Sequence, residues 1–217
     1  MSLVINYPYL LGVLAAGSLL RYGLGRYRAR SYQNHGEALV SQAIQKSFNS
    51  SDFHLLNHIT LKIKGGTTQV DHILVSRFGV FVIETKDYKG WIFANPTHPF
   101  WTQVIFGRKF KFQNPIFQNM QHMRAVTDLL DFLPADTIKP LVVFVGQAEF
   151  KTDRPPGVYN LSELIEYIRN QTSEVLSLNR MQFCVGRLET TRLAVTGKTD
   201  LEHIQNLQSR HGDQHSH

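Results

Sequence analysis

The chain of 217 residues contains a single cysteine, Cys184. One cysteine excludes an intramolecular disulfide and fits a reducing compartment, where structural disulfides are rare. The apolar residues around it, in the run 173–189, predict a packed helix in which Cys184 fills core space. Internal repeats and long low-complexity linkers are also missing, so the part after residue 30 is expected to form one domain with its own core.

Acidic residues are absent from the first 30 positions, whose charged side chains are Arg21, Arg26, Arg28 and Arg30. The rest of the chain carries nineteen Lys and Arg residues against seventeen Asp and Glu residues. The formal net charge of +6 therefore comes mostly from the N-terminal segment and does not indicate a globally basic nucleic-acid surface. A basic segment of this kind is attracted to anionic lipid head groups.

Charge is also missing from residues 3–20, eighteen mostly apolar positions that directly precede Arg21. About 17–25 apolar residues can cross a bilayer as one helix. Because the basic residues follow the apolar run, the pattern favours an uncleaved anchor over a signal peptide. The positive-inside rule predicts a single-pass protein of the inner or plasma membrane whose domain faces the cytoplasm. Pro8 interrupts the run, and a helix buried against a partner or against the domain itself is the alternative.

The most informative pattern lies on two predicted strands, residues 67–76 and 79–86, which a short turn connects. Asp71 lies on the first strand, and Glu84 and Lys86 lie two residues apart on one face of the second. The four residues before Glu84 are all apolar, as in strands that are buried on both faces. Charges at the end of such a strand indicate a site, although an exposed cross-strand ion pair would explain Glu84 and Lys86 alone.

A hairpin would bring the carboxylates of Asp71 and Glu84 and the ammonium of Lys86 to one point. Two carboxylates can hold a hard divalent cation such as Mg²⁺, which keeps water ligands and binds phosphate oxygens. The lysine adds a compact positive charge beside the attacked phosphate or the attacking water. These residues therefore predict metal-assisted hydrolysis of a phosphodiester, with Mg²⁺ or Mn²⁺ as the cofactor.

Several short motifs accompany these residues: Gly36-Glu37, Asp71-His72, GVFVIETK at 79–86, Gly90, and NPIFQN at 114–119. In combination they resemble the nuclease-related domain family, NERD, over roughly residues 34–145. That family is similar to the PD-(D/E)XK restriction-endonuclease-like superfamily, from whose pattern this chain departs by having Val70 rather than Pro before the aspartate. The resemblance implies an α/β fold with a mixed central sheet flanked by helices. It also implies a metal-dependent nuclease acting on DNA, with RNA as a weaker alternative.

The resemblance also implies roles for individual residues. Asp71, Glu84 and Lys86 match the catalytic core, Glu37 matches the acidic residue of the first core helix, and Gln118 matches a polar position on the helix after the sheet. Asp71, Glu84 and Glu37 would then bind the metal, Lys86 would stabilise charge, and Gln118 would contact the substrate or the site.

The residues alone leave alternatives open for the two outer positions. Glu37 lies near the start of a predicted helix over 34–48, where an acid also suits the helix dipole. Gln118 follows Asn114-Pro115, which predicts a cap and first-turn proline, and it could be a solvated helix residue. His72 is expected to point to the opposite strand face from Asp71 and to be structural.

The best local candidate for nucleic-acid contact is the basic set Arg108, Lys109 and Lys111, interleaved with phenylalanines. Alternation along a predicted strand places Lys109 and Lys111 on one face and Phe110 and Phe112 on the other. An ordinary half-buried strand has the same pattern, so both interpretations stand.

The remaining elements are a buried strand at 140–146, a short helix at 161–170 and a last helix at about 200–209. The three histidines of the tail could bind a transition metal or belong to a disordered polar terminus. The predicted domains are an anchor with a basic juxtamembrane segment (1–30), a nuclease-related domain with a helical extension (31–210), and a tail (211–217). Two function classes follow: a membrane-anchored nuclease, or a catalytically weak nucleic-acid-binding or scaffold module on the same fold.

Overall fold

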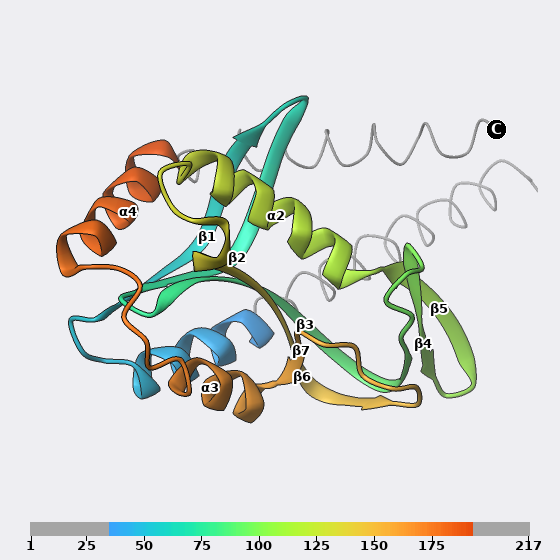
Figure 1. The fold of residues 1–217 in the computed structure, drawn as a ribbon. Helices are drawn as coiled ribbons and strands as arrows, with labels where there is room; N and C mark the ends of the chain where they lie inside the picture. Colours follow the sequence, from blue (N-terminus) through green and yellow to red (C-terminus); the bar gives the residue numbers. More distant parts are fainter. Residues whose placement is uncertain (1–34, 193–217) are drawn as a thin grey trace, which may run out of the picture.

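The computed structural model describes residues 35–192, which form a mixed sheet with helices on both faces (Figure 1). A helix over residues 35–47 comes first. The strands are β1 (Phe53–Ile63), β2 (Gly66–Ser76), β3 (Gly79–Phe93), β4 (Phe100–Ile105), β5 (Arg108–Gln113), β6 (Ile138–Phe150) and β7 (Val158–Asn160), and the later helices are α2 (Pro115–Leu129), α3 (Leu161–Arg169) and α4 (Leu178–Thr191). The predicted mixed α/β sheet flanked by helices is confirmed.

The sheet begins as an antiparallel meander of β1, β2 and β3. Phe53 pairs with Ser76 across the first hairpin, and Ser76 pairs with Gly79 across the second. On its other edge β3 pairs in parallel with β6, from Val80 opposite Ile138 onwards, and β6 pairs with the short β7. The predicted strands are therefore present, but β3 and β6 both run several residues beyond their expected ends.

A fork opens between β2 and β3. Their pairing stops at His72 and Ile83, so Asp71 and Glu84 are the first residues inside it. Beyond this point β2 remains paired with β1, while β3 remains paired with β6 and turns away (Figure 1). The edge of β3 gains another strand neighbour, β4, only from Trp91 onwards. We call this separation, with β2 on one side and β3 on the other, the fork.

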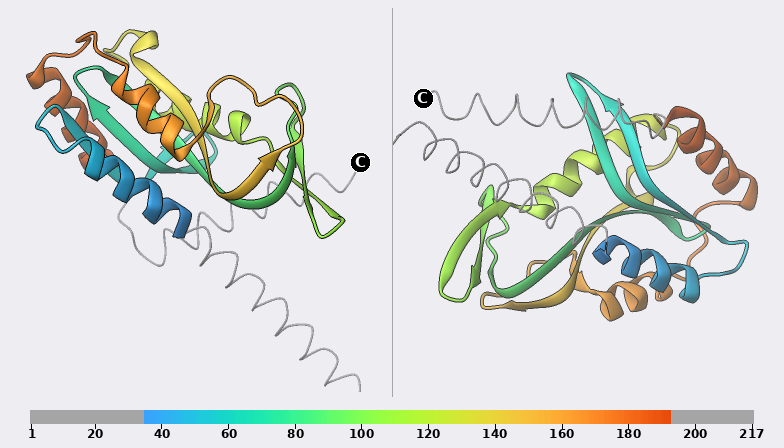
Figure 2. Two further views of the ribbon diagram at one scale, coloured as in Figure 1. Left: turned by 90° about the horizontal axis from the view of Figure 1, so that it is seen from below. Right: turned by 180° about the vertical axis from the view of Figure 1, so that it is seen from behind.

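The two faces of the sheet are covered by different helices. Helices α2 and α4 lie over one face, and the helix 35–47 lies with α3 over the other (Figure 2). Ile73 and Val82 belong to the core under α2 and α4, whereas Leu74 and Ile83 belong to the core of the opposite face. Because side chains alternate along strands, Asp71 shares the face of Ile73, and Glu84 that of Val82. Both carboxylates therefore lie on the α2 side.

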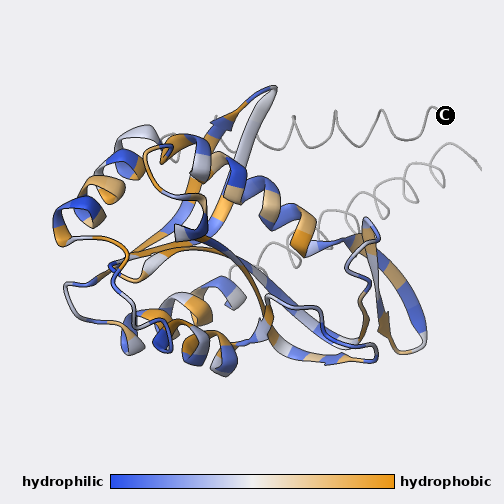
Figure 3. Ribbon diagram, in the orientation of Figure 1, coloured by the Kyte–Doolittle hydropathy of each residue, from blue (hydrophilic) through white to orange (hydrophobic). Residues whose placement is uncertain are grey.

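The β4–β5 hairpin extends the sheet beyond the fork. Hydrophilic and hydrophobic residues alternate along β5, whereas β4 ends in two apolar residues (Figure 3). The Trp101 ring is buried against Phe144, Phe112 and Phe150, with a centroid distance of 6.2 Å to Phe144. This aromatic cluster fixes the hairpin to β6.

Helix starts follow their capping residues. The Asn114 side chain accepts from the backbone N–H of Ile116 and Pro115 occupies the first turn, as predicted. Helix α3 lies within the predicted range 161–170, and Asn160 and Glu163 form a capping box at its start. The helix predicted over 173–189 is wrong at its start, because α4 begins only after Ser177.

The physical reason is a competing interaction. The backbone N–H groups of Val175 and Leu176 donate to the carbonyl of Arg77, which holds this segment extended against the β2–β3 turn. Val175 and Phe183 are about half exposed, although the Phe183 ring lies edge to face against Phe132 at 5.1 Å, while Cys184 fills core space as expected.

The predicted anchor 3–20, the basic segment that follows it, the last helix at 200–209 and the tail 211–217 all lie outside the described residues. Within residues 35–192, no helix is both long enough and apolar enough to cross a bilayer. The domain boundaries stay predictions.

Candidate functional site

Asp71 closes the inner end of the fork. Its Oδ2 accepts the backbone N–H of Thr85 at 2.7 Å, in place of the strand-to-strand hydrogen bonds that end at His72 and Ile83. The side chain is buried. A carboxylate thus substitutes for the strand partner at the point where the two strands separate.

Glu84 and Lys86 lie on β3 inside the fork and point to the same face, as predicted. The Lys86 ammonium donates to Glu84 Oε1 at 2.5 Å and to Gln118 Oε1 on α2 at 3.0 Å. Glu84 is fully buried and Lys86 nearly so. The structure therefore brings Gln118 to the predicted catalytic residues rather than leaving it in solvent.

His122, which the sequence analysis did not single out, connects the two sides of the fork. Its Nε2 lies 3.1 Å from Glu84 Oε2 on β3, and its Nδ1 lies 2.7 Å from Thr68 Oγ1 on β2. It is one turn beyond Gln118 on the same helix face. Asn119, on that face too, donates to the carbonyls of Val82 and Leu141. The available signal was the polar set Gln118, Asn119 and His122, whose spacing places it on one face of a helix.

Glu37 reaches the site from the helix 35–47. Its Oε2 lies 3.1 Å from Nδ1 of His58. His58 has φ +52 and interrupts the β1–β2 pairing at the position opposite Asp71. The preceding Gly36 explains how the helix comes so near, because a Cβ there would lie 2.6 Å from the Asp87 Cβ.

Burial and mutual repulsion act on the three carboxylates. Burial, followed by the charges of Glu84 and Glu37, raises the pKa of Asp71 well above its usual range. Burial and the Glu84 charge likewise raise the pKa of Glu37 to about 7. Burial also disfavours charge on Glu84, but Lys86 and His122 outweigh it and hold its pKa below the usual value.

The same balance applies to Lys86. Burial alone would lower its pKa, but the charge of Glu84 outweighs burial and raises it. Glu84 and Lys86 are therefore an ionised pair, whereas Asp71 and Glu37 are carboxylates for which the protein provides too little positive charge. A bound cation would supply what is missing.

His72 lies on the other face of β2, as predicted. Its Nδ1 is 2.7 Å from Asn57 Oδ1, and burial lowers its pKa to about 3. A neutral ring bonded to Asn57 is a structural element of the meander.

An open cleft of about 740 Å³ reaches the site at Lys86. Its walls come from β3, β4, β6 and the start of the first helix: His35, Thr85, Lys86, Asp87, Tyr88, Lys89, Gln103, Ile105, Gly146 and Gln147. The fork thus connects a buried polar cluster with solvent.

The predicted nucleic-acid residues Arg108, Lys109 and Lys111 are exposed on β5, separate from the carboxylates. The strand register places Arg108 opposite Ile105, on the face that borders the cleft. Lys109 and Lys111 lie on the other face of the hairpin, in agreement with the predicted alternation.

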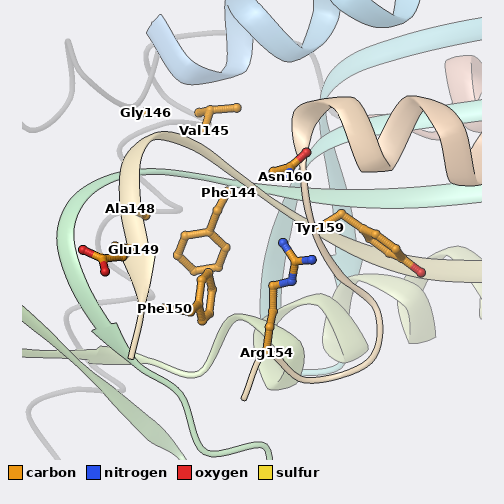
Figure 4. Close-up of a pocket in the computed structure, with 9 residues that line it drawn as sticks. All are labelled: Phe144, Val145, Gly146, Ala148, Glu149, Phe150, Arg154, Tyr159 and Asn160. Carbon is orange, nitrogen blue, oxygen red and sulfur yellow. The ribbon is translucent and has the colours of Figure 1, made fainter. Parts of the chain in front are cut away.

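A second cavity, of about 450 Å³, lies where β6 faces the β7 segment (Figure 4). Phe144 and Phe150 pack edge to face at 5.0 Å, and the Arg154 guanidinium lies across from them. Arg154 is paired with Glu163 at 2.7 Å. None of the predicted site residues lines this cavity.

Residues 32–145 match NERD, the nuclease-related domain, and the chain belongs to this family. The PD-(D/E)XK relationship is consistent with that membership. An uncharacterized protein of Bacillus anthracis is 41% identical over 97 residues, which cover 44% of this chain and 45% of the relative. The match thus spans under half the length of that relative.

Proposed function

We propose that this protein is a divalent-metal-dependent nuclease that hydrolyses DNA phosphodiester bonds. Membership of the nuclease-related family supports the general class. The observation that carries the proposal is that Asp71 and Glu84 lie next to each other where β2 and β3 separate, beside the ammonium of Lys86. Glu37, on the helix 35–47, is near enough for its charge to raise the pKa of Asp71. RNA is the alternative substrate.

The donor set suits a hard cation. The electrostatics leave Asp71 and Glu37 undercompensated, and carboxylate oxygens are the ligands that Mg²⁺ and Mn²⁺ prefer. Among residues 35–192, no three Asp, Glu, His or Cys side chains form a ready-made metal cage. Mg²⁺ binds through one or two carboxylates and keeps several waters, so such a cage is not required. Asp71 and Glu84 would hold the ion, and Glu37 would bind it directly or through one of the waters that it keeps. The ion, when bound, would supply an activated water.

The chain's own residues prepare this chemistry. Lys86 offers an ammonium that can stabilise negative charge developing on a phosphate oxygen. Gln118 accepts from Lys86 and directs it, while His122 holds the second oxygen of Glu84. Glu37 and Asp71 position water or metal at the buried end of the cleft.

The decisive experiment measures cleavage of plasmid DNA, linear DNA and RNA by the purified full chain with Mg²⁺ or Mn²⁺, and with EDTA. Asp71→Asn removes a ligand charge and keeps the side-chain shape, so cleavage should fall at least about 100-fold. Lys86→Gln removes the charge but keeps a donor for Glu84, so it should slow cleavage while metal binding persists. Asp128→Asn, on the exposed part of α2, is the matched control.

A wild-type protein that cleaves no DNA or RNA with either metal, and that behaves as Asp71→Asn does, would favour the second candidate. That candidate is a catalytically weak nucleic-acid-binding or scaffold module. The specific observation in its favour is that Lys86 and His122 already neutralise Glu84 without a metal.

We also propose that residues 3–20 anchor the protein in the inner or plasma membrane, with the domain in the cytoplasm. Support comes from the sequence: an uncharged run followed by four arginines. The full chain should stay in the membrane pellet after high-salt and alkaline washes. Its release into the supernatant would contradict the anchor.

A further inference from the structure

A solvent-exposed face of the sheet combines aromatic and basic side chains. It consists of Lys89, Trp91 and Phe93 on β3 and of Lys109 and Lys111 on β5, and we call it the aromatic–basic face. Trp91 is 49% and Phe93 is 39% exposed. All three lysines are exposed as well.

The strand register brings these residues together. Trp91 pairs with Val104, which pairs with Lys109, and Phe93 pairs with Thr102, which pairs with Lys111. Residues directly opposite one another in antiparallel strands point to the same face. Each aromatic residue of β3 is thus in one row with a lysine of β5.

On the opposite face of the same strands, Ile92 and Trp101 are buried in the aromatic cluster that includes Phe112. Gln103 and Ile105, further along that face, line the cleft. Burial of that face accounts for the fold of the hairpin, but it does not account for two large aromatic rings directed to solvent.

We propose that the aromatic–basic face binds a single-stranded nucleic-acid segment and leads it towards the cleft. Bases stack on exposed aromatic rings irrespective of sequence, and lysines hold the backbone phosphates. A duplex keeps its bases stacked on one another, so it cannot use the rings in this way. The inference rests on the proposed nuclease function and names the form of its substrate.

Charge and continuity support this occupant. The Lys151 ammonium lies 4.9 Å from the Trp91 ring centroid and pairs with Glu149, so the ring already accepts a cation from the solvent side. An incoming base would take the place of that ammonium. Lys89 belongs both to this face and to the cleft, five residues along β3 from Glu84. At about 3.3 Å per residue this is about 17 Å, a few nucleotides.

The test uses the full chain, EDTA to prevent cleavage, and a fluorescent oligothymidine of about fifteen nucleotides. Trp91→Ala and Phe93→Ala should each raise the dissociation constant of the oligonucleotide roughly 5- to 100-fold, as expected for loss of one stacked base. Phe183→Ala, which removes a similarly exposed ring on α4 (54% exposed), should leave the constant unchanged. The matching duplex should bind more weakly and respond little to Trp91→Ala.

Two further readouts separate stacking from charge. The chain has two tryptophans, and Trp101 is 1% exposed, so quenching by the oligonucleotide should come from Trp91 and vanish in Trp91→Phe while binding persists. A plot of the logarithm of the binding constant against the logarithm of the salt concentration has a negative slope. Lys109→Gln and Lys111→Gln should each make that slope shallower by about 0.7.

Equal effects of Phe183→Ala and Trp91→Ala, or tighter duplex binding, would overturn the proposal. So would loss of binding to phosphatidylserine vesicles in Trp91→Ala without loss of oligothymidine binding, which would make this face a membrane contact. Absent quenching would also overturn the proposal, because Trp91 would then not stack on a base. The binding assay contains EDTA and needs no cleavage, so a failed cleavage assay and a failed binding assay remain distinguishable.

Discussion

Strands β2 and β3 differ in structure on the two sides of the residue pair His72–Ile83. From His72–Ile83 to the turn, they are paired, and apolar side chains such as Ile73 and Val82 are buried between helix layers. Burying one such side chain contributes about 1.5–3 kcal/mol. One residue further, the ladder ends and the same strands bury Asp71 and Glu84, which costs free energy unless the charges are compensated. The stretch that stabilises the sheet and the stretch that carries the candidate site are thus adjacent on the same two strands.

The largest expected contrast is between a core residue and a fork residue. Phe81→Ala empties a fully buried site in the paired stretch and should reduce the free energy of unfolding by about 3–5 kcal/mol. Asp71→Asn should leave stability unchanged or raise it in EDTA near pH 8, because it removes a carboxylate whose pKa burial and neighbouring acids raise. Denaturant unfolding of both variants checks this. A strongly destabilised Asp71→Asn would mean that its bond to Thr85 holds the strands together.

A smaller effect should follow from His122, which joins the sides of the fork. His122→Ala deprives Glu84 Oε2 and Thr68 Oγ1 of their shared partner, and groups around metal ligands typically contribute 10- to 100-fold in affinity. We expect Mg²⁺ affinity to fall by about that factor, measured by calorimetry. His54→Ala, on an exposed position of β1, serves as the control. Unchanged Mg²⁺ affinity would remove Glu84 from the proposed ligand set.

The smallest effect concerns pH. The pKa of Glu37 rises from 4.5 to about 7 on folding, so the folded state keeps a proton that the unfolded state releases between these values. The free energy of unfolding should therefore fall as pH rises through this window, and level off above it. Relative to Glu37→Gln, the metal-free wild type should lose stability between pH 4.5 and 7, as thermal melts in EDTA would measure. A constant difference would mean that Glu37 is not buried in solution.

The apolar runs allowed much of this fold to be predicted from the sequence. The hairpin of 67–76 and 79–86, the strand after α2 and the Asn114-Pro115 helix start depend on local patterns, and all are present. The pairing of β3 with β6 rather than with a sequence neighbour could not be read locally. The late start of α4 has the same cause, since the carbonyl of Arg77 that holds Val175 is almost a hundred residues away.

For the candidate site, motif order indicated which residues converge but not how they are supported. Alternation placed Glu84 and Lys86 on one face, and the hairpin predicted that Asp71 lies beside them; the register and the contacts agree. His58 and His122 escaped notice because their partners, Glu37 and Glu84, are distant in sequence. The separation of β2 from β3 was equally hidden, since nothing in the residues around Asp71 resembles a turn.

The parallel pairing of β3 and β6 has a consequence for the order of folding. The meander needs only residues 53–83 and has short connections, so it can form early during synthesis. Glu84 pairs with Val142, and closing that long connection requires α2 to be complete. A growing chain therefore has a hydrophobic hairpin sheet well before its carboxylates are enclosed. The polar cluster is thus completed after the hairpin sheet, and a growing chain that ends before α2 does not yet contain it.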